Sequence, residues 1–248
     1  MKYKYLAWFS AGITSAIACK LAIESGRTKI VYFETGSHHT DALRFKNDCE
    51  KWFGQEIEVW NNKKYEDHFD VILSTGWING TGGARCTDAL KKEVRKTVER
   101  FYLWENQVFG FEYSKAELLR AKRFKIQNPL TKPLFPLIKK HITKENAAAI
   151  VMNAGIELPE MYKLGYNHNN CIGCVKGGMG YWNKIRIDFP TIFQRMVEVE
   201  NEVGASCING KFLKDLKPDE GREESIIVPE CGSFCENSRF LFENKVAV

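Results

Sequence analysis

The stretch from Tyr3 to Ile23, YKYLAWFSAGITSAIACKLAI, constrains the fold more than any other part of the chain. Residues 5–9 form an apolar and aromatic run of the length of a buried strand. Ile13, Ile17 and Leu21 then recur every four residues, which is the pattern of a helix packed on a sheet. A tight turn of small and hydroxyl residues joins the two. A strand, a turn and a helix in this order predict an α/β fold.

The turn at Ser10–Ser15 is itself a candidate phosphate site. A strand that leads through a tight turn into a helix leaves backbone N–H groups unpaired, with the positive end of the helix dipole behind them. Gly12 would let an anion approach the backbone, and the hydroxyls of Ser10, Thr14 and Ser15 can bond its oxygens. Any strand-to-helix turn favours small residues, and for so short a motif this structural explanation is about equally frequent.

Further strands and helices alternate along the chain and predict a parallel, doubly wound sheet. Ligands of such sheets bind beyond the carboxyl ends of the strands, so the Ser10–Ser15 turn and Thr35-Gly36 would face one crevice. We expect a nucleotide-binding domain over residues 1–160 and a smaller cysteine-containing region over 161–248. The elements expected are strands at 29–33, 56–60 and 107–111, and helices at 41–53 after a Thr40 cap, from after Lys91 to about Tyr102, from 114 with a Ser114/Glu117 capping box, and at 190–203.

Composition narrows the class of protein. The chain has 248 residues, 44% of them apolar, and a net charge of +5, which suits an anionic ligand and permits contact with nucleic acid. No apolar run is long enough to span a bilayer, and the start lacks the apolar core of a signal peptide. The sequence therefore predicts a soluble, cytoplasmic protein with no membrane partner.

Cysteine spacing points to thiol or metal chemistry. The chain has eight cysteines and no secretory signal, which argues against a disulfide scaffold. Cys19 is expected in the core of the first helix. Cys171-Ile172-Gly173-Cys174 has the spacing of a metal knuckle, and equally that of a redox pair.

Several stretches, in order, resemble known families of nucleotide enzymes. Ser10–Ser15 resembles the Ser-Gly-Gly-x-Asp-Ser PP-loop of the ATP pyrophosphatases in the adenine nucleotide alpha hydrolase-like superfamily, with Ala11 and Thr14 replacing a glycine and the aspartate. Over about Leu6 to Cys174 the chain resembles the phosphoadenosine phosphosulfate reductase family. The matching segments are Val31–Gly36, Cys86–Lys91, Phe109–Glu112 with Glu117 and Arg120, Pro136–Ile138, and Leu158–Tyr166 before the Cys-x-x-Cys.

The resemblance implies roles for individual residues. The phosphates of an adenine nucleotide would lie on Ser10, Gly12, Thr14 and Ser15, with Thr35 and Gly36 on the ribose side. Lys91 would reach an acidic group, and Gly110 would let the backbone pass close to the nucleotide. The retained Ser15 favours ATP, cleaved between its α- and β-phosphates. Thr14 weakens the Mg²⁺ site that an aspartate would supply.

The resemblance also implies a cysteine-bound cofactor. Adenylyl-sulfate reductases bind a [4Fe–4S] cluster with a cysteine pair before the lysine and a later Cys-x-x-Cys. Here Cys86, Cys171 and Cys174 match three of these ligands, and Cys235 would supply a fourth. Four thiolates suit zinc as well as iron–sulfur. Glu230-Cys231-Gly232 resembles the reductases' C-terminal nucleophile motif without its histidine, so Cys231 is expected to be either a nucleophile or a ligand.

A short aromatic and basic cluster follows the Cys-x-x-Cys and is expected to contact nucleic acid or to form an ordinary surface. It consists of Tyr181, Trp182, Lys184 and Arg186. Three functions remain: an ATP-dependent enzyme of sulfur chemistry, a sulfonucleotide reductase that uses Cys231, and a non-catalytic nucleotide-binding module. The acceptor is a nucleic acid or a small molecule, and a homo-oligomer is left open.

Overall fold

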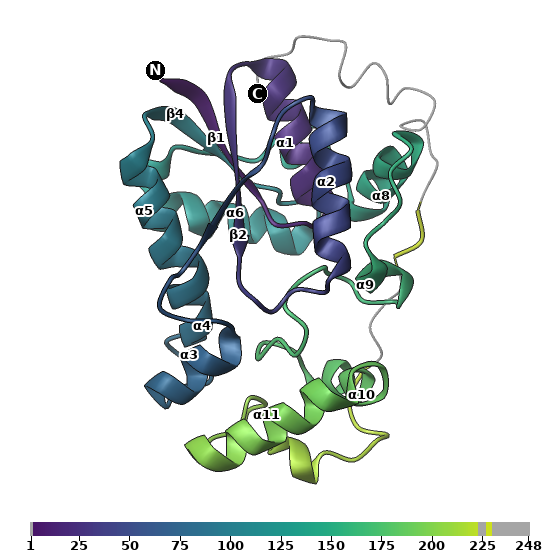
Figure 1. Ribbon diagram of the computed structural model, residues 1–248. Helices are drawn as coiled ribbons and strands as arrows, with labels where there is room; N and C mark the ends of the chain where they lie inside the picture. The colour runs from purple at the N-terminus through teal and green to yellow at the C-terminus, as the bar shows by residue number, and fades with distance from the viewer. Residues whose placement is uncertain (1, 223–226, 230–248) are drawn as a thin grey trace.

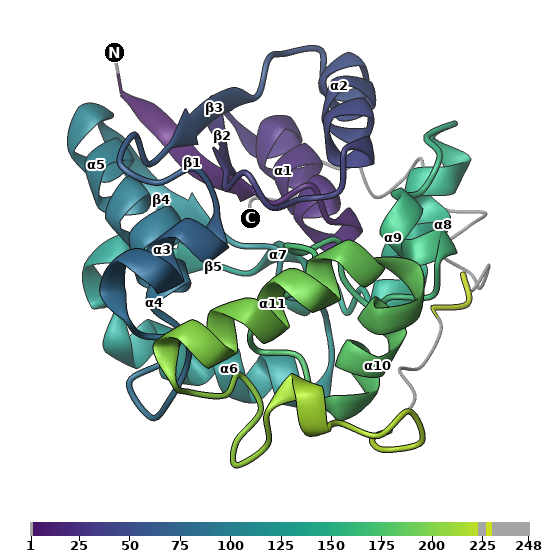
Figure 2. The same cartoon turned by 60° about the horizontal axis from the view of Figure 1, so that its bottom comes forward.

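The computed structural model describes residues 2–222 and 227–229. Its centre is a sheet of five parallel strands in the order β3-β2-β1-β4-β5. Figure 1 shows the sheet between its helices, and Figure 2 labels all of its strands. Strand β1 is the central strand, and its residues are buried on both faces of the sheet, as expected for a parallel sheet. The strands are β1 (Tyr3–Phe9), β2 (Thr28–Glu34), β3 (Glu58–Asn61), β4 (Trp104–Val108) and β5 (Pro133–Leu134).

Helices cover both faces of the sheet, which makes the α/β prediction correct and is compatible with a doubly wound fold. Tyr5, Ala7 and Phe9 of β1 pack with one set of helices: α1 (Ile13–Ser25), α2 (Asp41–Phe53), α7 (Pro136–Lys139) and α8 (Lys144–Asn153). Leu6 and Trp8 pack on the other face with α5 (Val94–Phe101) and α6 (Lys115–Gln127).

The strand order reverses between β1 and β4. The chain moves outward from β1 through β2 to β3, and then crosses back to place β4 on the other side of β1. In open α/β sheets, such a switch point leaves a crevice beyond the carboxyl ends of the two strands. The Ser10–Ser15 turn follows β1, and Gly110 follows β4, so both lie at this position.

The C-terminal helices lie beyond the carboxyl ends of the strands (Figures 1 and 2). They are α9 (Glu160–Lys163), α10 (Met179–Asp188), α11 (Pro190–Val203) and the 3₁₀ turn η3 (Leu213–Asp215). Trp182 is the largest fully buried side chain of their core, which also takes in Phe69 and Ile72 of α3 (His68–Thr75). The division of the chain at residue 160 stays a prediction. No helix among the described residues is long and apolar enough to cross a membrane.

Several local predictions are wrong in detail. Thr40 has a helical backbone and its side chain makes no capping hydrogen bond. β4 ends at Val108, three residues before the expected end of that strand. Ser114 accepts from the N–H of Glu117, which is half of the expected capping box, whereas Thr143 and Asn146 form a complete one.

The basic helix expected after Lys91 is α5, which ends at Phe101. The structure also makes the preceding segment helical, as α4 (Arg85–Thr87) and the π-helical stretch η1 (Asp88–Glu93). The connection after α6 holds a second 3₁₀ turn, η2 (Pro129–Thr131). The helix at 190–203 was predicted correctly, with Gly204 in the left-handed region at its end.

Candidate functional site

The loop between β1 and α1 is held closed by its own hydroxyls. The Oγ of Ser15 accepts from the backbone N–H of Ser10 at 3.0 Å and donates to the Gly12 carbonyl at 2.8 Å. The two serine hydroxyls are 3.1 Å apart, and Ser15 is buried. The hydroxyl of Ser15 therefore shapes the loop from inside. Thr14 is half-buried and Ser10 is exposed.

Ala11 shows that the loop backbone is strained. Its φ is 56°, in the left-handed region that costs a residue with a Cβ about 1 kcal/mol. The ATP pyrophosphatase motif, which the loop resembles, has glycine at this position. The N-terminus of α1 carries no side-chain cap and no acidic residue in its first turn. The first N–H groups of this 13-residue helix and its dipole are thus directed at the loop without a competing carboxylate.

Gly110 packs directly against the loop. A Cβ on Gly110 would lie 2.6 Å from the Cα and 2.7 Å from the N of Ser15, closer than any side chain tolerates. The sequence predicted that Gly110 lets the backbone approach a nucleotide. In the structure, its lack of a side chain lets the segment that follows β4 approach the backbone of the loop. Contact with a nucleotide stays a prediction.

Two residues of the C-terminal region hold the loop from the other side. The side-chain amide of Asn169 donates to the Ala11 carbonyl at 2.7 Å, and its Oδ1 has no partner among the described residues although the side chain is buried. The Tyr162 hydroxyl accepts from the backbone N–H groups of Ile13 and Asn169. The strained peptide at Ala11 is therefore fixed by a buried hydrogen bond.

The end of β2 forms a second part of the site. Glu34 Oε1 accepts from the N–H groups of Thr35 and Gly36, both at 2.8 Å. The hydrogen bond with His38, followed by these N–H groups, lowers the pKa of Glu34 to about 2. Gly36 has a φ of 66°, and a Cβ there would lie 1.9 Å from the Glu66 carbonyl oxygen. This glycine is thus required by the backbone.

Thr35 joins this turn to the cysteines. It is buried, and its hydroxyl lies 3.3 Å from the Sγ of Cys171 and 3.2 Å from Nδ1 of His38. The resemblance assigned Thr35 to the ribose side of a nucleotide. Its hydroxyl is engaged within the protein, whereas its position at the carboxyl edge agrees with the predicted crevice.

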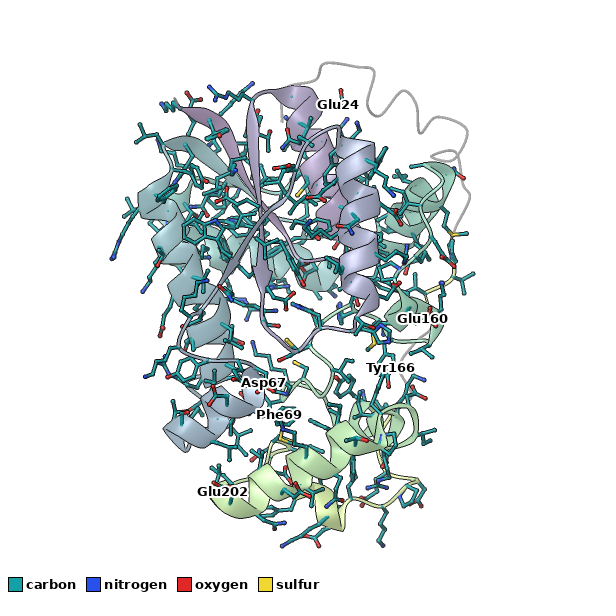
Figure 3. The ribbon with its side chains drawn as sticks, in the orientation of Figure 1. Glu24, Asp67, Phe69, Glu160, Tyr166 and Glu202 are labelled. Carbon is teal, nitrogen blue, oxygen red and sulfur yellow. The ribbon has the colours of Figure 1, made fainter. Side chains whose placement is uncertain are left out.

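The turn between Cys171 and Cys174 is held by contacts from distant segments. The backbone N–H of Ile172 donates to the Ser37 carbonyl at 2.8 Å, and the N–H of Cys174 donates to the Tyr181 hydroxyl at 2.9 Å. The imidazole of His68 lies beneath the turn, with its Nε2 3.7 Å from the position of a Cβ on Gly173. Figure 3 shows Phe69 and Tyr166 in this layer between the sheet and the C-terminal helices.

Cys86 and Lys91 come from the α4–η1 segment to the same place. Burial, followed by the neighbouring Cys171 and Cys174, raises the pKa of Cys86 to about 11 against the opposing charges of Lys176 and Lys91. Burial likewise raises the pKa of Cys174, and Lys91 again opposes it. The structure thus brings together the three cysteines and the lysine that the sequence singled out. Residues 86–91 lie about 80 positions from the Cys-x-x-Cys in sequence.

The cysteines do not form a complete metal site in the described part of the chain. Within residues 2–222 and 227–229, no group of three or more His, Cys, Asp or Glu side chains is arranged to hold a metal ion. Cys231 and Cys235 lie outside the described residues, so their roles as nucleophile and ligand stay predictions. The iron–sulfur and zinc hypotheses also stay predictions.

A cavity of about 330 Å³ adjoins the cysteine turn. It opens between the turn and the start of α10, beside the residues that hold the loop after β1. Its lining includes Tyr166, His168, Cys171, Cys174, Lys176 and Tyr181. A small molecule bound there would contact the thiols.

Of the two alternatives for residues 181–186, the structure fits an ordinary amphipathic surface better than stacking on nucleic acid. Trp182 is fully buried and cannot stack on a base. The Tyr181 hydroxyl supports the cysteine turn, Lys184 pairs with Asp188 at 2.9 Å, and Arg186 donates to the Leu216 carbonyl at 2.6 Å. The alternation of aromatic and basic residues here is that of a helix with one face in the core.

Sequence reasoning missed Asn169, Tyr162 and His68. Tyr162 had been noted only as part of a family pattern, and an asparagine beside a Cys-x-x-Cys reads as a turn residue. None of the three lies in a spacing that indicates contact with the loop or with the cysteine turn. A pairing of these positions across related sequences is the signal that would have found them.

Comparison with known proteins gives one distant likeness and no family. No protein-family model matches the chain. An uncharacterized protein of Methanocaldococcus jannaschii is 22% identical over 209 residues, which are 82% of this chain and 42% of that protein. The chain thus spans about two-fifths of the length of this relative. Neither comparison names a function, so any functional conclusion depends on the geometry of the loop, Lys91 and the cysteine turn.

Proposed function

We propose that the chain is a PP-loop enzyme that binds ATP at the Ser10–Ser15 loop and reacts at the α-phosphate of the nucleotide. The observation that carries the proposal is the loop itself, which is fixed in a strained conformation at the switch point of a parallel sheet. Ser15, Gly110 and Asn169 hold it there from three sides. Strain that is maintained by so many contacts is typical of ligand sites.

The chain supplies electrostatic stabilisation in this proposal. Loop N–H groups and the positive end of α1 would bind phosphate oxygens, assisted by the exposed hydroxyl of Ser10 and by Thr14. The ammonium group of Lys91 lies close to Cys86 and Cys174 and has no carboxylate partner among the described residues. It would neutralise charge on the acceptor or on the leaving pyrophosphate. Mg²⁺ would enter with the nucleotide, because the first turn of α1 offers no carboxylate.

The thiols beside Lys91 support sulfur chemistry as the second half of the reaction. Cys86, Cys171 and Cys174 lie next to one another, and Cys171 hydrogen-bonds the turn that ends β2. The proposal therefore keeps the predicted family, the PP-loop enzymes that resemble phosphoadenosine phosphosulfate reductases. A sulfonucleotide reductase that uses Cys231 is the alternative, and its substrate would occupy the same loop.

Calorimetric titration of the full chain tests which nucleotide the loop binds. The ligands are α,β-methylene-ATP with Mg²⁺, which resists cleavage at the α-phosphate, and adenylyl sulfate. Tighter binding of the ATP analogue, with slow release of pyrophosphate from ATP itself, supports the proposal. Tighter binding of adenylyl sulfate with thiol-dependent release of sulfite favours the reductase. If a folded sample binds neither ligand at 1 mM, an affinity of about −4 kcal/mol or weaker, the proposal is wrong.

A further inference from the structure

Positive charge is concentrated in one segment of the chain. Residues 113–144 contain nine lysines and arginines and a single acidic residue, Glu117, which gives the segment a net charge of +8. The whole chain has a net charge of +5, so all other residues together carry −3. The basic character of the protein therefore comes entirely from this segment, which begins after β4 and includes α6.

Helix α6 exposes most of its charge to solvent. Ala121 is its only fully buried residue among 13, whereas Lys115, Lys122, Arg123 and Lys125 are all exposed. The exposed side also carries apolar residues, with Ile126 79% exposed. Lys122 and Arg123 lie between Leu119 and Ile126, so the apolar side chains form no continuous stripe.

These charges lack the partners that basic residues have elsewhere in the protein. Among the described residues, no carboxylate pairs with Lys115, Lys122, Arg123, Lys125 or Lys132; Glu117 pairs with Arg120 instead. Elsewhere, lysines pair with an acidic residue four positions away in the chain, as in Lys46–Glu50 at 2.8 Å and Lys92–Asp88 at 2.7 Å. Like charges that are left close together without counter-ions repel one another, and a polyanion would relieve that repulsion.

The basic segment reaches the candidate site. The Arg120 guanidinium lies over the ring of Phe111 at 4.2 Å, just beyond β4. Nearby, Lys144 Nζ lies 3.4 Å from Nδ1 of His168, whose ring also lines the cavity beside the cysteine turn. Burial, then the charges of Lys144 and Arg120, lower the pKa of His168. Arg120 and Lys144 thus connect the cavity with α6, with Glu112 3.9 Å from Lys144 and Glu117 3.1 Å from Arg120.

We propose that α6 is the centre of a nucleic-acid-binding surface, formed by Lys115, Lys122, Arg123, Lys125 and Lys132. Four of these exposed cations lie on α6 and Lys132 follows it, with no exposed aromatic ring among them, which suits contact with phosphates and not with bases. Membrane binding needs a continuous apolar face, and the interruption of Leu119 and Ile126 by basic residues removes it. The proposal of this surface depends only on its charge pattern. Delivery of the bound strand to the crevice, as the acceptor, rests on the proposed function.

Fluorescence anisotropy with a labelled 20-nucleotide single-stranded RNA, and with DNA of the same sequence, tests the surface without added ATP. The test variant of the full chain carries Lys122→Gln, Arg123→Gln and Lys125→Gln. The control carries Lys63→Gln, Lys64→Gln and Lys217→Gln, which remove the same charge at exposed positions away from α6. Thermal melting of both variants checks that they remain folded.

We expect the native chain and the control to bind similarly, with affinity that falls steeply as salt rises. The test variant should bind at least about tenfold more weakly. The magnitude of the slope of log K against log salt should fall by about 2 for three lost phosphate contacts. Equal binding by the test variant and the control overturns the proposal. So does equal competition by polyglutamate, which would indicate an acidic protein partner, or stronger binding to phosphatidylserine vesicles than to RNA. Loss of RNA binding with normal ATP binding would separate this surface from the nucleotide site.

Discussion

The loop after β1 and the turn between Cys171 and Cys174 are both short and contain glycine, but they are held in different ways. The hydroxyl bonds that close the loop join residues at most five positions apart, with Ser15 at their centre, and Asn169 adds one distant bond to the Ala11 carbonyl. The cysteine turn depends on Tyr181, which is close in the chain, and on Ser37 and His68, which are far from it. A local motif can therefore specify how the loop closes, whereas the cysteine turn exists only when the whole fold is formed.

The strongest test of the loop is Gly110→Ala. The new Cβ would overlap the backbone of Ser15, so the loop must move away from β4. We expect ATP binding to weaken on the order of hundredfold or more, together with a loss of about 1–3 kcal/mol in stability. Gly82→Ala is the control, since a Cβ there meets no atom within 4 Å. Normal ATP binding by folded Gly110→Ala would contradict the role of the loop.

Acid should disrupt the cysteine turn before the loop. Burial lowers the pKa of His68 to about 4, below the ordinary 6.5. The neutral ring is therefore the form that the fold favours. Its contribution is fully present above pH 6.5 and is lost as pH falls toward 4, at a cost of about 3 kcal/mol. Denaturation from pH 7 to pH 4 measures this, and His68→Gln should flatten the curve. An unchanged slope in the variant would exclude His68 as the cause.

Asn169 connects the two regions, so its removal should affect both. Asn169→Ala leaves the Ala11 carbonyl without its buried donor, at a cost of about 1–3 kcal/mol. ATP should bind about tenfold more weakly. Asn183→Ala is a matched control, since Asn183 is also buried and donates to two backbone carbonyls, but in the C-terminal core. Both variants should lose stability. If ATP affinity falls equally in both, Asn169 has no specific role at the loop.

The smallest effect is expected at the hydroxyl of Thr35. Thr35→Val keeps the shape of the side chain and removes its contact with Cys171, at a cost of about 1 kcal/mol. Chemical denaturation compares it with Thr131→Val, which removes another buried threonine hydroxyl far from the cysteines. Only Thr35→Val should change the rate at which Cys171 reacts with a thiol reagent. Equal rates in the two variants would show that the contact has no influence on the thiol.

The same division explains what the sequence could predict. Apolar patterning predicted β1 and α1, because β1 is a continuous buried apolar run and Ile13, Ile17 and Leu21 of α1 are all buried at a spacing of four. The end of β4 was misjudged because Phe109 and Phe111 continue the apolar pattern past the last strand pairing, into an aromatic cluster with Phe135. Trp182 was misread because a buried tryptophan and an exposed one look alike in sequence. The hydrogen bond of Asn169 to Ala11 spans 158 positions, and no local rule predicts it.

The π-helical stretch that carries Lys91 has a consequence for how this site could change by insertion or deletion. A π-helical turn holds one residue more than an α-helical turn, and such turns are frequent at functional sites. Deleting one residue from Asp88–Glu93 would therefore convert the stretch into regular α-helical turns and keep α4 and α5 in register, because the residue removed is the extra one. Within the stretch the side chains would change direction, so Lys91 would leave the cysteines. The extra residue is thus tied to the position of Lys91, and a one-residue deletion here should be less tolerated than in the loop at 76–83.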